Sequence, residues 1–484
     1  MTRTGRTAGT SAAWEPIVLL ALAFILAVIR FHDLGSAPFI NDEPKLQIII
    51  DDHLQNHTLP MVGLVGTREV QYGPTALWAY LPVRFFTDNI DTIVAAHAAY
   101  VVLGLLLLFL AIRRTIGKTE AAWIFTLAAS SPFLFFYARL AWDNTFLIPT
   151  TGGALYALSL LDGQRERRPW IWLALGILAG LAFNAHLMII PVLAALGIAT
   201  FPHWLGLRSW KRMMTSASAL VIGFAAVTVG YIASVYPSLL QGSQMKLSWQ
   251  GFLTIPSILA GTTQWVSQSG MVYFLDQPAT TILDAGWILR GAALIMAGIC
   301  ALRFRQQPTL VRFGVWSILL LALYYVLLLP DLRHPHYFMG VWWVPFLFLA
   351  PVLQRRSAAI RTLAKGTIAL VIAMNVAFVG RTYAGIRENS GTRGLHYGTS
   401  QAQIHATVQA MCLRLSERDA SRAVVDLTAV PGVLPPSVIY FFLHLPACAG
   451  REIAFAQSAV DQGTIFFRLR YGSATPLDAG LKLE

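Results

Sequence analysis

Charged residues are scarce in this chain. Asp, Glu, Lys and Arg make up only 12% of its 484 residues, whereas hydrophobic residues make up 56%. The mean hydropathy of +0.58 excludes an ordinary soluble protein and indicates a polytopic membrane protein. The three cysteines are too few for a disulfide framework or a zinc site. Cys412 and Cys448 are candidates for a single disulfide, with two buried free thiols as the alternative.

Motifs that would announce a nucleotide enzyme are also missing. The chain has no Gly-rich phosphate loop and no Rossmann fingerprint, and no internal repeat is evident. The net charge of +12 comes from Lys and Arg clusters between apolar runs. This pattern follows the positive-inside rule, so we attribute the charge to membrane topology and not to nucleic-acid binding.

Long apolar runs are what the chain has instead. Each is close to the ~20 residues that a helix needs to cross a bilayer. They predict about eleven spans, namely Ala13–Phe31, Ile93–Ile112, Ala121–Tyr137, Asn144–Leu161, Trp170–Phe183, Leu187–Pro202, Ala217–Val235, Ile282–Leu302, Gly314–Leu329, Phe338–Leu353 and Thr367–Val379. The first has no small-residue cleavage site after it, which favours an uncleaved signal anchor.

The basic clusters all fall on one side if the N-terminus is cytoplasmic. An odd number of spans then places the C-terminal region outside. We expect the protein to lie in the inner (plasma) membrane in this orientation. We expect a transmembrane module over residues 1–382, with long outer loops at about 33–91 and 236–284, and an outer domain over 383–484. A helix-like stretch at Gln401–Glu417 and strand-like stretches at 423–427 and 464–469 predict a small α/β fold for that domain.

Ionisable residues that do not report topology gather at the outer ends of the spans. Four separate segments contribute them, and the residues are Asp42, Glu43, Lys45, Arg139, Asp143, His186, Arg333, His334, His336 and Tyr337. Ionisable groups at a membrane boundary predict a functional site. The acids are candidates for a general base, and the cations and histidines are candidates for an anion site.

Each of these residues also has a purely structural interpretation. Asn41 and Asp42 precede Pro44, so they fit the start of a helix as caps. Arg139 and Asp143 have the i, i+4 spacing of an ion pair within a helix. His186 is in a short turn between two spans, where an interfacial histidine is common. The segment from Arg333 to Tyr337 also fits an ordinary polar loop.

An enzyme facing outward has no nucleotide pool, so it needs a substrate that is already activated and already outside. A sugar on a lipid phosphate meets that need, because its tail lies in the membrane and its phosphate at the interface. Arginines and histidines at the span ends would hold the phosphate, and a carboxylate would deprotonate an acceptor hydroxyl.

The order of these motifs resembles a known family. The chain places Asp42-Glu43 in the first outer loop, then Tyr72-Gly73-Pro74, Arg139 before Asp143, Gly180–His186, and Arg333–Phe338. Over about the first 350 residues it is similar to the GT-C glycosyltransferases that use polyprenyl-phosphate sugars, relatives of protein O-mannosyltransferases and of the lipid A aminoarabinose transferase.

The resemblance implies the GT-C fold, to which the count of about eleven spans belongs, and a sugar transfer that inverts the anomeric carbon. It assigns Asp42 as the catalytic carboxylate, with Glu43 beside it and Asp143 as the acid of the second loop. Donor-phosphate contacts would come from Arg139, His186, Arg333, His334, His336, Tyr337 and Tyr72. Many relatives carry lysines where this chain has Tyr72 and His186, so Arg333 and its neighbouring histidines are candidates to replace them.

We therefore predict a membrane glycosyltransferase that moves a sugar from a polyprenyl monophosphate to an acceptor hydroxyl of a glycan, lipid or protein on the outer face. A divalent metal is compatible with the acids, although no motif indicates one. The alternatives are a secondary transporter or lipid flippase, and an inactive scaffold of the same fold. A transporter would place its site near the midplane, often at broken helices in repeated halves.

Overall fold

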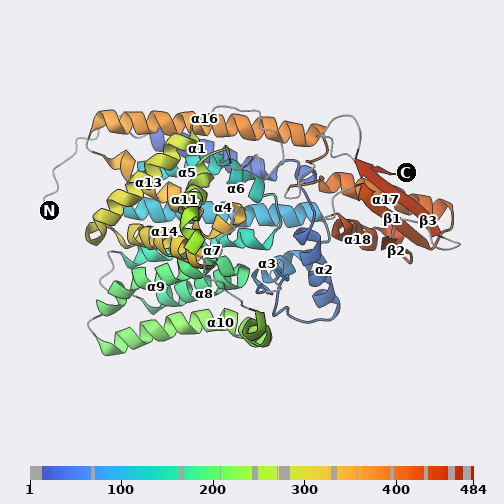
Figure 1. Cartoon of the computed structure of the whole chain (residues 1–484), viewed down its shortest axis with the longest axis horizontal. Helices are drawn as coiled ribbons and strands as arrows, with labels where there is room; N and C mark the ends of the chain where they lie inside the picture. The colour runs from blue at the N-terminus through green and yellow to red at the C-terminus, as the bar shows by residue number, and fades with distance from the viewer. Residues whose placement is uncertain are drawn as a thin grey trace.

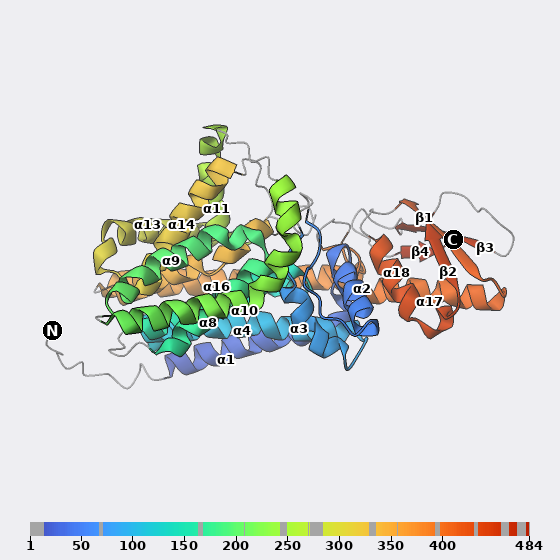
Figure 2. The ribbon, with the colours of Figure 1, turned by 90° about the horizontal axis from the view of Figure 1, so that it is seen from below.

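The structure is a computed structural model of the chain. It describes residues 14–66, 71–162, 168–207, 209–242, 249–269, 271, 284–328, 335–355, 357–392, 397–429, 434–455, 464–471 and 481–483. Most of these residues are helical, and the long helices lie side by side along one direction (Figure 1). A smaller part that contains the sheet lies at one end of this bundle (Figures 1 and 2).

The bundle is built from the apolar runs of the sequence. Its helices are α1 (Glu15–Val28), α4 (Ile90–Thr115), α5 (Lys118–Ser130), α6 (Pro132–Tyr137), α7 (Leu147–Leu161), α8 (Pro169–Ala185), α9 (Ile190–Leu205), α10 (Trp210–Gly242), α11 (Ile255–Thr263), α13 (Gly286–Leu302), α14 (Thr309–Leu328), α15 (Val344–Leu349) and α16 (Ala358–Glu388). Each predicted span falls on at least one of these helices.

The predicted count of eleven spans is not established. Among the described residues, five helices are long and apolar enough to cross a membrane, or six if one bent pair counts as one span. Some predicted spans are broken helices. Pro132 begins α6 directly after the end of α5, and the segment that we predicted as Phe338–Leu353 is bent by 52°. The chain is a multi-pass membrane protein.

Glycines allow neighbouring helices of the bundle to pack closely. A Cβ atom at Gly176 on α8 would overlap the backbone oxygen of Leu220 on α10, and one at Gly223 on α10 would overlap that of Leu173 on α8. Close backbone approach through small residues is a common way for membrane helices to associate, because lipid provides no hydrophobic driving force between them.

Two shorter helices follow α1 and lie at the end of the bundle that faces the sheet (Figure 2). They are α2 (Asp42–Gln55) and α3 (Thr75–Arg84). Leu46 and Ile50 on α2 are buried, whereas Lys45 and Asp52 are exposed. The weak amphipathic pattern of 45–53 therefore corresponds to a real helix with one face in the core.

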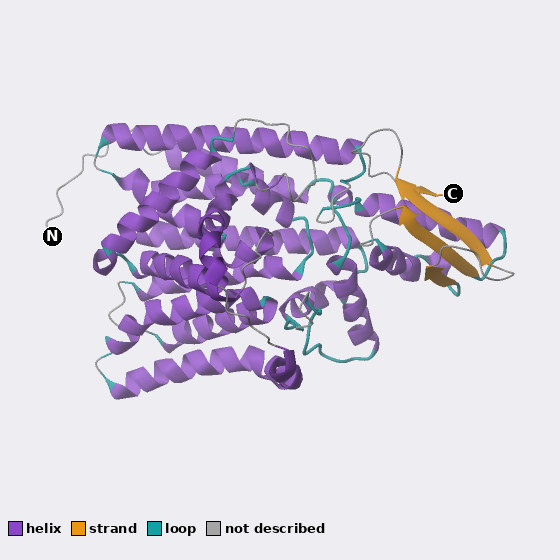
Figure 3. Ribbon diagram, in the orientation of Figure 1, coloured by secondary structure: helices purple, strands orange, loops and turns teal. Residues whose placement is uncertain are grey.

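The C-terminal part contains α17 (Gln401–Glu417), α18 (Pro435–His444) and a sheet of β1 (Arg422–Ala429), β2 (Glu452–Phe455), β3 (Thr464–Tyr471) and β4 (Leu481–Leu483) (Figure 3). The strand order is β2-β1-β3-β4. β1 pairs in parallel with β2 and β3, and β4 is antiparallel to β3. The helix predicted at Gln401–Glu417 and both predicted strands are confirmed.

Cys412 on α17 and Cys448 after α18 form a disulfide that closes this part of the chain on itself. Of the two arrangements open from the sequence, the structure has the bridge. The remaining thiol, Cys300, is buried on α13.

The helix α16 relates the two ends of the molecule. Lys365, in its second turn, forms an ion pair with Glu15 at the start of α1, and the helix ends at Glu388, close to the sheet-containing part (Figure 1). At 1.5 Å per residue, its 31 residues span about 46 Å, enough to cross a bilayer with length to spare. The sheet thus lies at the end of the bundle opposite Glu15.

Candidate functional site

The acidic pair of the first loop lies at the beginning of α2. Phe39 and Ile40 anchor the preceding chain in the core, and Asn41 turns it with a φ of +54° and a ψ of −100°. This region is rarely adopted by non-glycine residues, and such strain is often found at functional sites. The side chain of Asn41 makes no capping hydrogen bond. Asn41 therefore occupies the N-cap position of α2, as the structural interpretation of the sequence expected, but its side chain does not bond to the first N–H groups of the helix.

Asp42 is held from two sides. Trp142 Nε1 donates to Asp42 Oδ2 at 3.0 Å, and Lys45 Nζ forms an ion pair with Asp42 Oδ1 at 3.2 Å. The carboxylate remains 29% exposed, so a substrate group can still reach it. A partly exposed carboxylate with its position set by two donors has the geometry of a general base.

Two further carboxyl groups lie beside Asp42, and both are buried. Burial, with the charge of Asp42 nearby, raises the pKa of Asp143 to about 8. Burial also raises the pKa of Glu43 well above its usual range, with Asp42 and Asp143 adding to the shift. Like charges in a buried site oppose ionisation, so the surroundings of Asp143 and Glu43 favour the neutral form of both carboxyl groups. The three members of this acid cluster share one environment.

Aromatic and histidine rings line the same region. The rings of Tyr72 and His186 are 4.6 Å apart, and those of Trp142 and His336 are 4.9 Å apart. The next residue, Tyr337, packs edge to face against His336, with ring centroids 4.3 Å apart. Burial raises the pKa of Tyr72, and Asp143, Tyr337 and Asp42 raise it further. Tyr72, His186, His336 and Tyr337 therefore lie near the acids.

His186 is a neutral group in this site. Burial lowers its pKa to about 4, and its Nδ1 accepts a hydrogen bond from the backbone N–H of Met188 at 3.1 Å. The ring thus carries its proton on Nε2 and can donate a hydrogen bond there. It does not replace the positive charge of a lysine.

Arg139 does not join the group. It is fully buried, and its guanidinium donates to the backbone oxygens of His32 at 2.8 Å and Asp33 at 2.6 Å, and to Ser36 Oγ at 2.8 Å. The helix α6 ends at Tyr137, so Arg139 and Asp143 lack the helical spacing that an i, i+4 pair requires. The predicted intrahelical ion pair is wrong, and Arg139 holds the chain that follows α1.

Comparison with known proteins places this geometry in a known fold. The family model for dolichyl-phosphate-mannose-protein mannosyltransferases matches residues 73–232. ArnT from Cupriavidus metallidurans in the apo state is 14% identical, with a TM-score of 0.54 over 93% of this chain and 87% of ArnT. The structure of that ArnT bound to undecaprenyl phosphate is 16% identical, with a TM-score of 0.52 over 89% and 75% of the two chains. The chain has the GT-C fold.

The oligosaccharyltransferase from Archaeoglobus fulgidus, in complex with zinc and sulfate, is 15% identical and has a TM-score of 0.48 over 90% of this chain and 62% of its own. No curated protein matches the sequence. The GT-C fold confirms the fold type that the sequence motifs indicated.

Within this GT-C fold, the described residues account for part of the predicted site. Arg333 and His334 lie outside the described residues, whereas Pro335 begins a short described helix that carries His336 and Tyr337. Trp142 was missed as a site residue. Its one signal in the sequence is its position directly before Asp143, and a tryptophan at a span end is usually attributed to the membrane interface.

No group of three or more His, Cys, Asp or Glu side chains is arranged to hold a metal ion within the described part of the chain. The sequence expectation that a divalent metal is compatible with the acids stays a prediction.

An apolar groove of about 470 Å³ lies between three helices of the GT-C bundle. Its walls come from α8, α9 and α10, and they include Ala179, Leu196 and Phe224. A Cβ at Gly197 would meet open space there. The helix α8 ends at Ala185, and α9 begins shortly after His186, so the groove is built on the helix pair that presents His186.

Proposed function

We propose that this protein is a glycosyltransferase that moves a sugar from a polyprenyl monophosphate to an acceptor hydroxyl on the outer face of the inner membrane, with inversion. The observation that carries the proposal is the convergence of Asp42, Glu43 and Asp143 with Lys45 and Trp142 in a chain of the GT-C fold.

Asp42 is the general base in this proposal. It is the exposed member of the acid cluster, and Trp142 and Lys45 set the position of its two oxygens. An acceptor hydroxyl that reaches it would lose its proton as the sugar–oxygen bond forms. Asp143 and Glu43 are buried, and burial raises the pKa of Asp143 to about 8 and the pKa of Glu43 well above its usual range. They limit the negative charge around the departing phosphate.

The leaving phosphate needs positive charge and hydrogen-bond donors. Lys45 supplies a cation that is 45% exposed and lies 3.2 Å from Asp42. His186 Nε2 and the hydroxyl of Tyr72 are neutral donors within the same cluster of rings. His336 contacts Trp142 and Tyr337, and Arg333 and His334 directly precede this segment in the sequence. Arg139 acts as a positioning residue for the loop.

The groove between α8, α9 and α10 fits the isoprenoid tail of such a donor. Its walls are apolar, and its helices meet next to His186. A lipid lying there would place its phosphate at the end of α8, near Tyr72, which contacts His186. One solved GT-C relative, ArnT, has undecaprenyl phosphate bound. The apolar groove and the polar groups at its end together suit a ligand with an apolar tail and a charged head.

The test is transfer of radiolabelled sugar from a panel of polyprenyl-phosphate sugars in membranes that contain the wild type, Asp42→Asn or Asp52→Asn. Asn keeps the size of the carboxylate but cannot take a proton. Asp52 is the matched control, because it lies on the same helix and is exposed, with its side chain bonded to Asn56.

We expect loss of transfer in Asp42→Asn and normal transfer in Asp52→Asn at equal protein level. Equal transfer by all three proteins would remove Asp42 from the reaction. Absence of transfer from every donor would refute the glycosyltransferase and favour the transporter or the inactive scaffold.

A further inference from the structure

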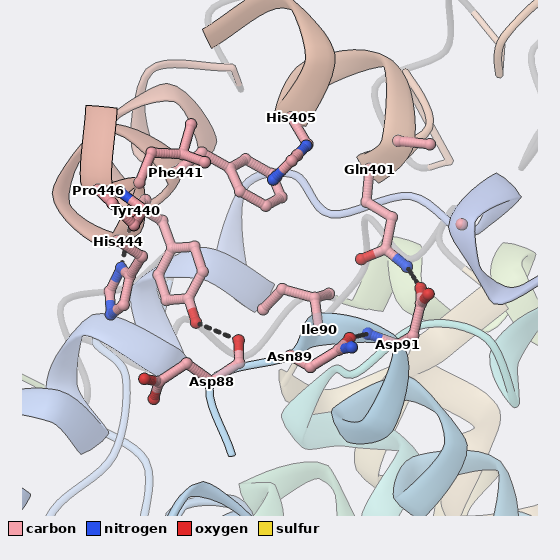
Figure 4. Close-up of a pocket in the computed structure, with 13 residues that line it drawn as sticks. Asp88, Asn89, Ile90, Asp91, Gln401, His405, Tyr440, Phe441, His444 and Pro446 are labelled. Carbon is pink, nitrogen blue, oxygen red and sulfur yellow. Dashed lines mark hydrogen bonds between the residues drawn. The ribbon is translucent and has the colours of Figure 1, made fainter. Parts of the chain in front are cut away.

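A cavity with both polar and aromatic walls lies away from the acids, between the C-terminal part and the beginning of α4. Its volume is about 540 Å³ (Figure 4). One wall comes from α17 and α18, and the other from residues 88–91. None of the site residues predicted from the sequence lines it. Its lining comes both from the C-terminal part and from residues that flank the membrane bundle.

One wall of the cavity is aromatic. The rings of His405 and Phe441 pack edge to face with centroids 5.3 Å apart, and Tyr440 packs against Phe441 at 5.7 Å (Figure 4). The hydroxyl of Tyr440 donates to the backbone oxygen of Asp88 at 3.4 Å. Aromatic rings fixed in this way offer flat apolar surface at little entropic cost, which suits stacking against another ring.

The facing wall is polar and directional. Gln401 is 3% exposed, and its Nε2 donates to the backbone oxygen of Leu34 at 2.9 Å and to Asp91 Oδ1 at 2.6 Å. These bonds turn the amide oxygen of Gln401 toward the cavity (Figure 4). Asn89, whose Oδ1 accepts from the Asp91 backbone N–H at 2.8 Å, lies on the same side. A buried amide oxygen held in place is an acceptor for a hydroxyl donor.

The charges around the cavity are largely paired with one another. Arg84 forms ion pairs with both Asp88 and Asp51. His444 Nε2 contacts Asp51 Oδ2 at 3.0 Å. A charged ligand would have to displace these partners, so the cavity favours a neutral ligand that combines an apolar ring face with hydroxyl groups. A sugar ring has that combination.

The helix α2 extends from the acids toward this cavity. Asp51 contacts two groups at the cavity edge, Arg84 and His444, and lies nine residues after Asp42 on the same helix. At 1.5 Å per residue, this separation is about 14 Å. A ring in the cavity is too far away to react, but it can belong to the same molecule as a hydroxyl that reaches Asp42.

We propose that the cavity binds a sugar ring of the acceptor that is remote from the reacting hydroxyl. The assignment of the bound ring to an acceptor rests on the proposed function, whereas the binding of a sugar ring in the cavity does not. The cavity would select acceptors that carry a glycan. Contacts with the remote sugar ring would supply binding energy that positions the reacting hydroxyl against the acids.

The experiment is a saturation-transfer NMR titration of the full-length protein in detergent with methyl glucoside, methyl mannoside and methyl galactoside. Four proteins are compared: wild type, His405→Ala, His405→Trp and Gln409→Ala. His405 is an exposed residue, so its removal leaves the core intact. Gln409 is exposed one turn further along α17 and does not line the cavity, which makes Gln409→Ala the matched control.

We expect binding of at least one glycoside to the wild type and to Gln409→Ala. Affinity should fall about fivefold in His405→Ala and recover in His405→Trp, since a ring is restored. No binding by the wild type, or equal binding by wild type and His405→Ala, would overturn the proposal.

Labelled transfer separates this outcome from the fate of the proposed function. If the protein transfers sugar from a polyprenyl phosphate but binds none of the glycosides, the cavity proposal fails and the glycosyltransferase stands. If glycosides bind at the cavity but no donor supports transfer, the assignment of the ring to an acceptor fails together with the proposed function.

Discussion

Trp142→Phe isolates one hydrogen bond in the acid cluster. The indole Nε1 donates to Asp42 Oδ2 at 3.0 Å, and its ring packs against His336 at 4.9 Å and Tyr137 at 6.5 Å. Phenylalanine keeps an aromatic ring in contact with both neighbours but cannot donate. The substitution therefore frees one oxygen of Asp42 and leaves most of the packing in place.

The expected loss of transfer rate follows from the strength of the hydrogen bond that Trp142 donates to the carboxylate of Asp42. A hydrogen bond to a charged group is worth about 1.5–3 kcal/mol. If that bond holds Asp42 in its reactive orientation, sugar transfer should slow about 10- to 150-fold. The assay is initial rate of label transfer at saturating donor, with the thermal midpoint of unfolding measured on the same preparations.

Trp78→Phe is the matched control. Trp78 Nε1 also donates a hydrogen bond, to the backbone oxygen of Pro60 at 2.8 Å, but it does not touch the acids. Its loss should leave the transfer rate within about twofold, because only stability changes. A Trp142→Phe enzyme as fast as the wild type, or a control that slows equally, would refute the role given to this bond.

Three further outcomes are expected. The pKa of Asp143 is raised in the fold to about 8 from 3.8. Its contribution to the free energy of unfolding is therefore full below about pH 3.8 and is lost as the pH rises through 8. Thermal unfolding at pH 6 and pH 9 should show this loss in the wild type and a smaller one in Asp143→Asn. Gly73→Ala should lower the thermal midpoint and raise the donor KM, because the added Cβ would lie 2.6 Å from a backbone atom of Asn184 on α8. Gly291→Ala should change neither, because a Cβ at Gly291 on α13 meets open space away from the groove. Replacing Cys412 and Cys448 together by Ser should lower the free energy of unfolding by about 3–4 kcal/mol, because the disulfide closes a loop with a sequence separation of 36 residues. Denaturant unfolding of the C-terminal part measures this loss, and an unchanged midpoint would count against the bridge.

The helices were predictable from the sequence, because apolar runs of bilayer length leave the backbone little choice. Their breaks were harder to predict. The run from Ala121 to Tyr137 looks continuous, but Ser131 accepts the backbone N–H of Leu134 and starts a new helix at Pro132. A serine followed by proline is a helix start even inside an apolar run.

The candidate site was predictable in its acids and less so in its cations. Asp42 and Asp143 stand out because carboxylates are costly near a bilayer. Arg139 stands out for the same reason, but the backbone oxygens that it binds belong to a loop more than a hundred residues earlier in the sequence. Backbone acceptors leave no trace in a sequence. The same holds for Trp142, whose partner is a side chain of another segment.

The hold of Arg139 on the chain after α1 has a consequence for genetics. Its guanidinium donates to acceptors on four residues and lies over the ring of Tyr383, 5.1 Å from the centroid. A lysine has neither the fork nor the plane to do this. Substitutions here would release the loop that leads into Asp42. In a screen for lost activity, such alleles would resemble lesions in the chemistry although every reacting group is still present.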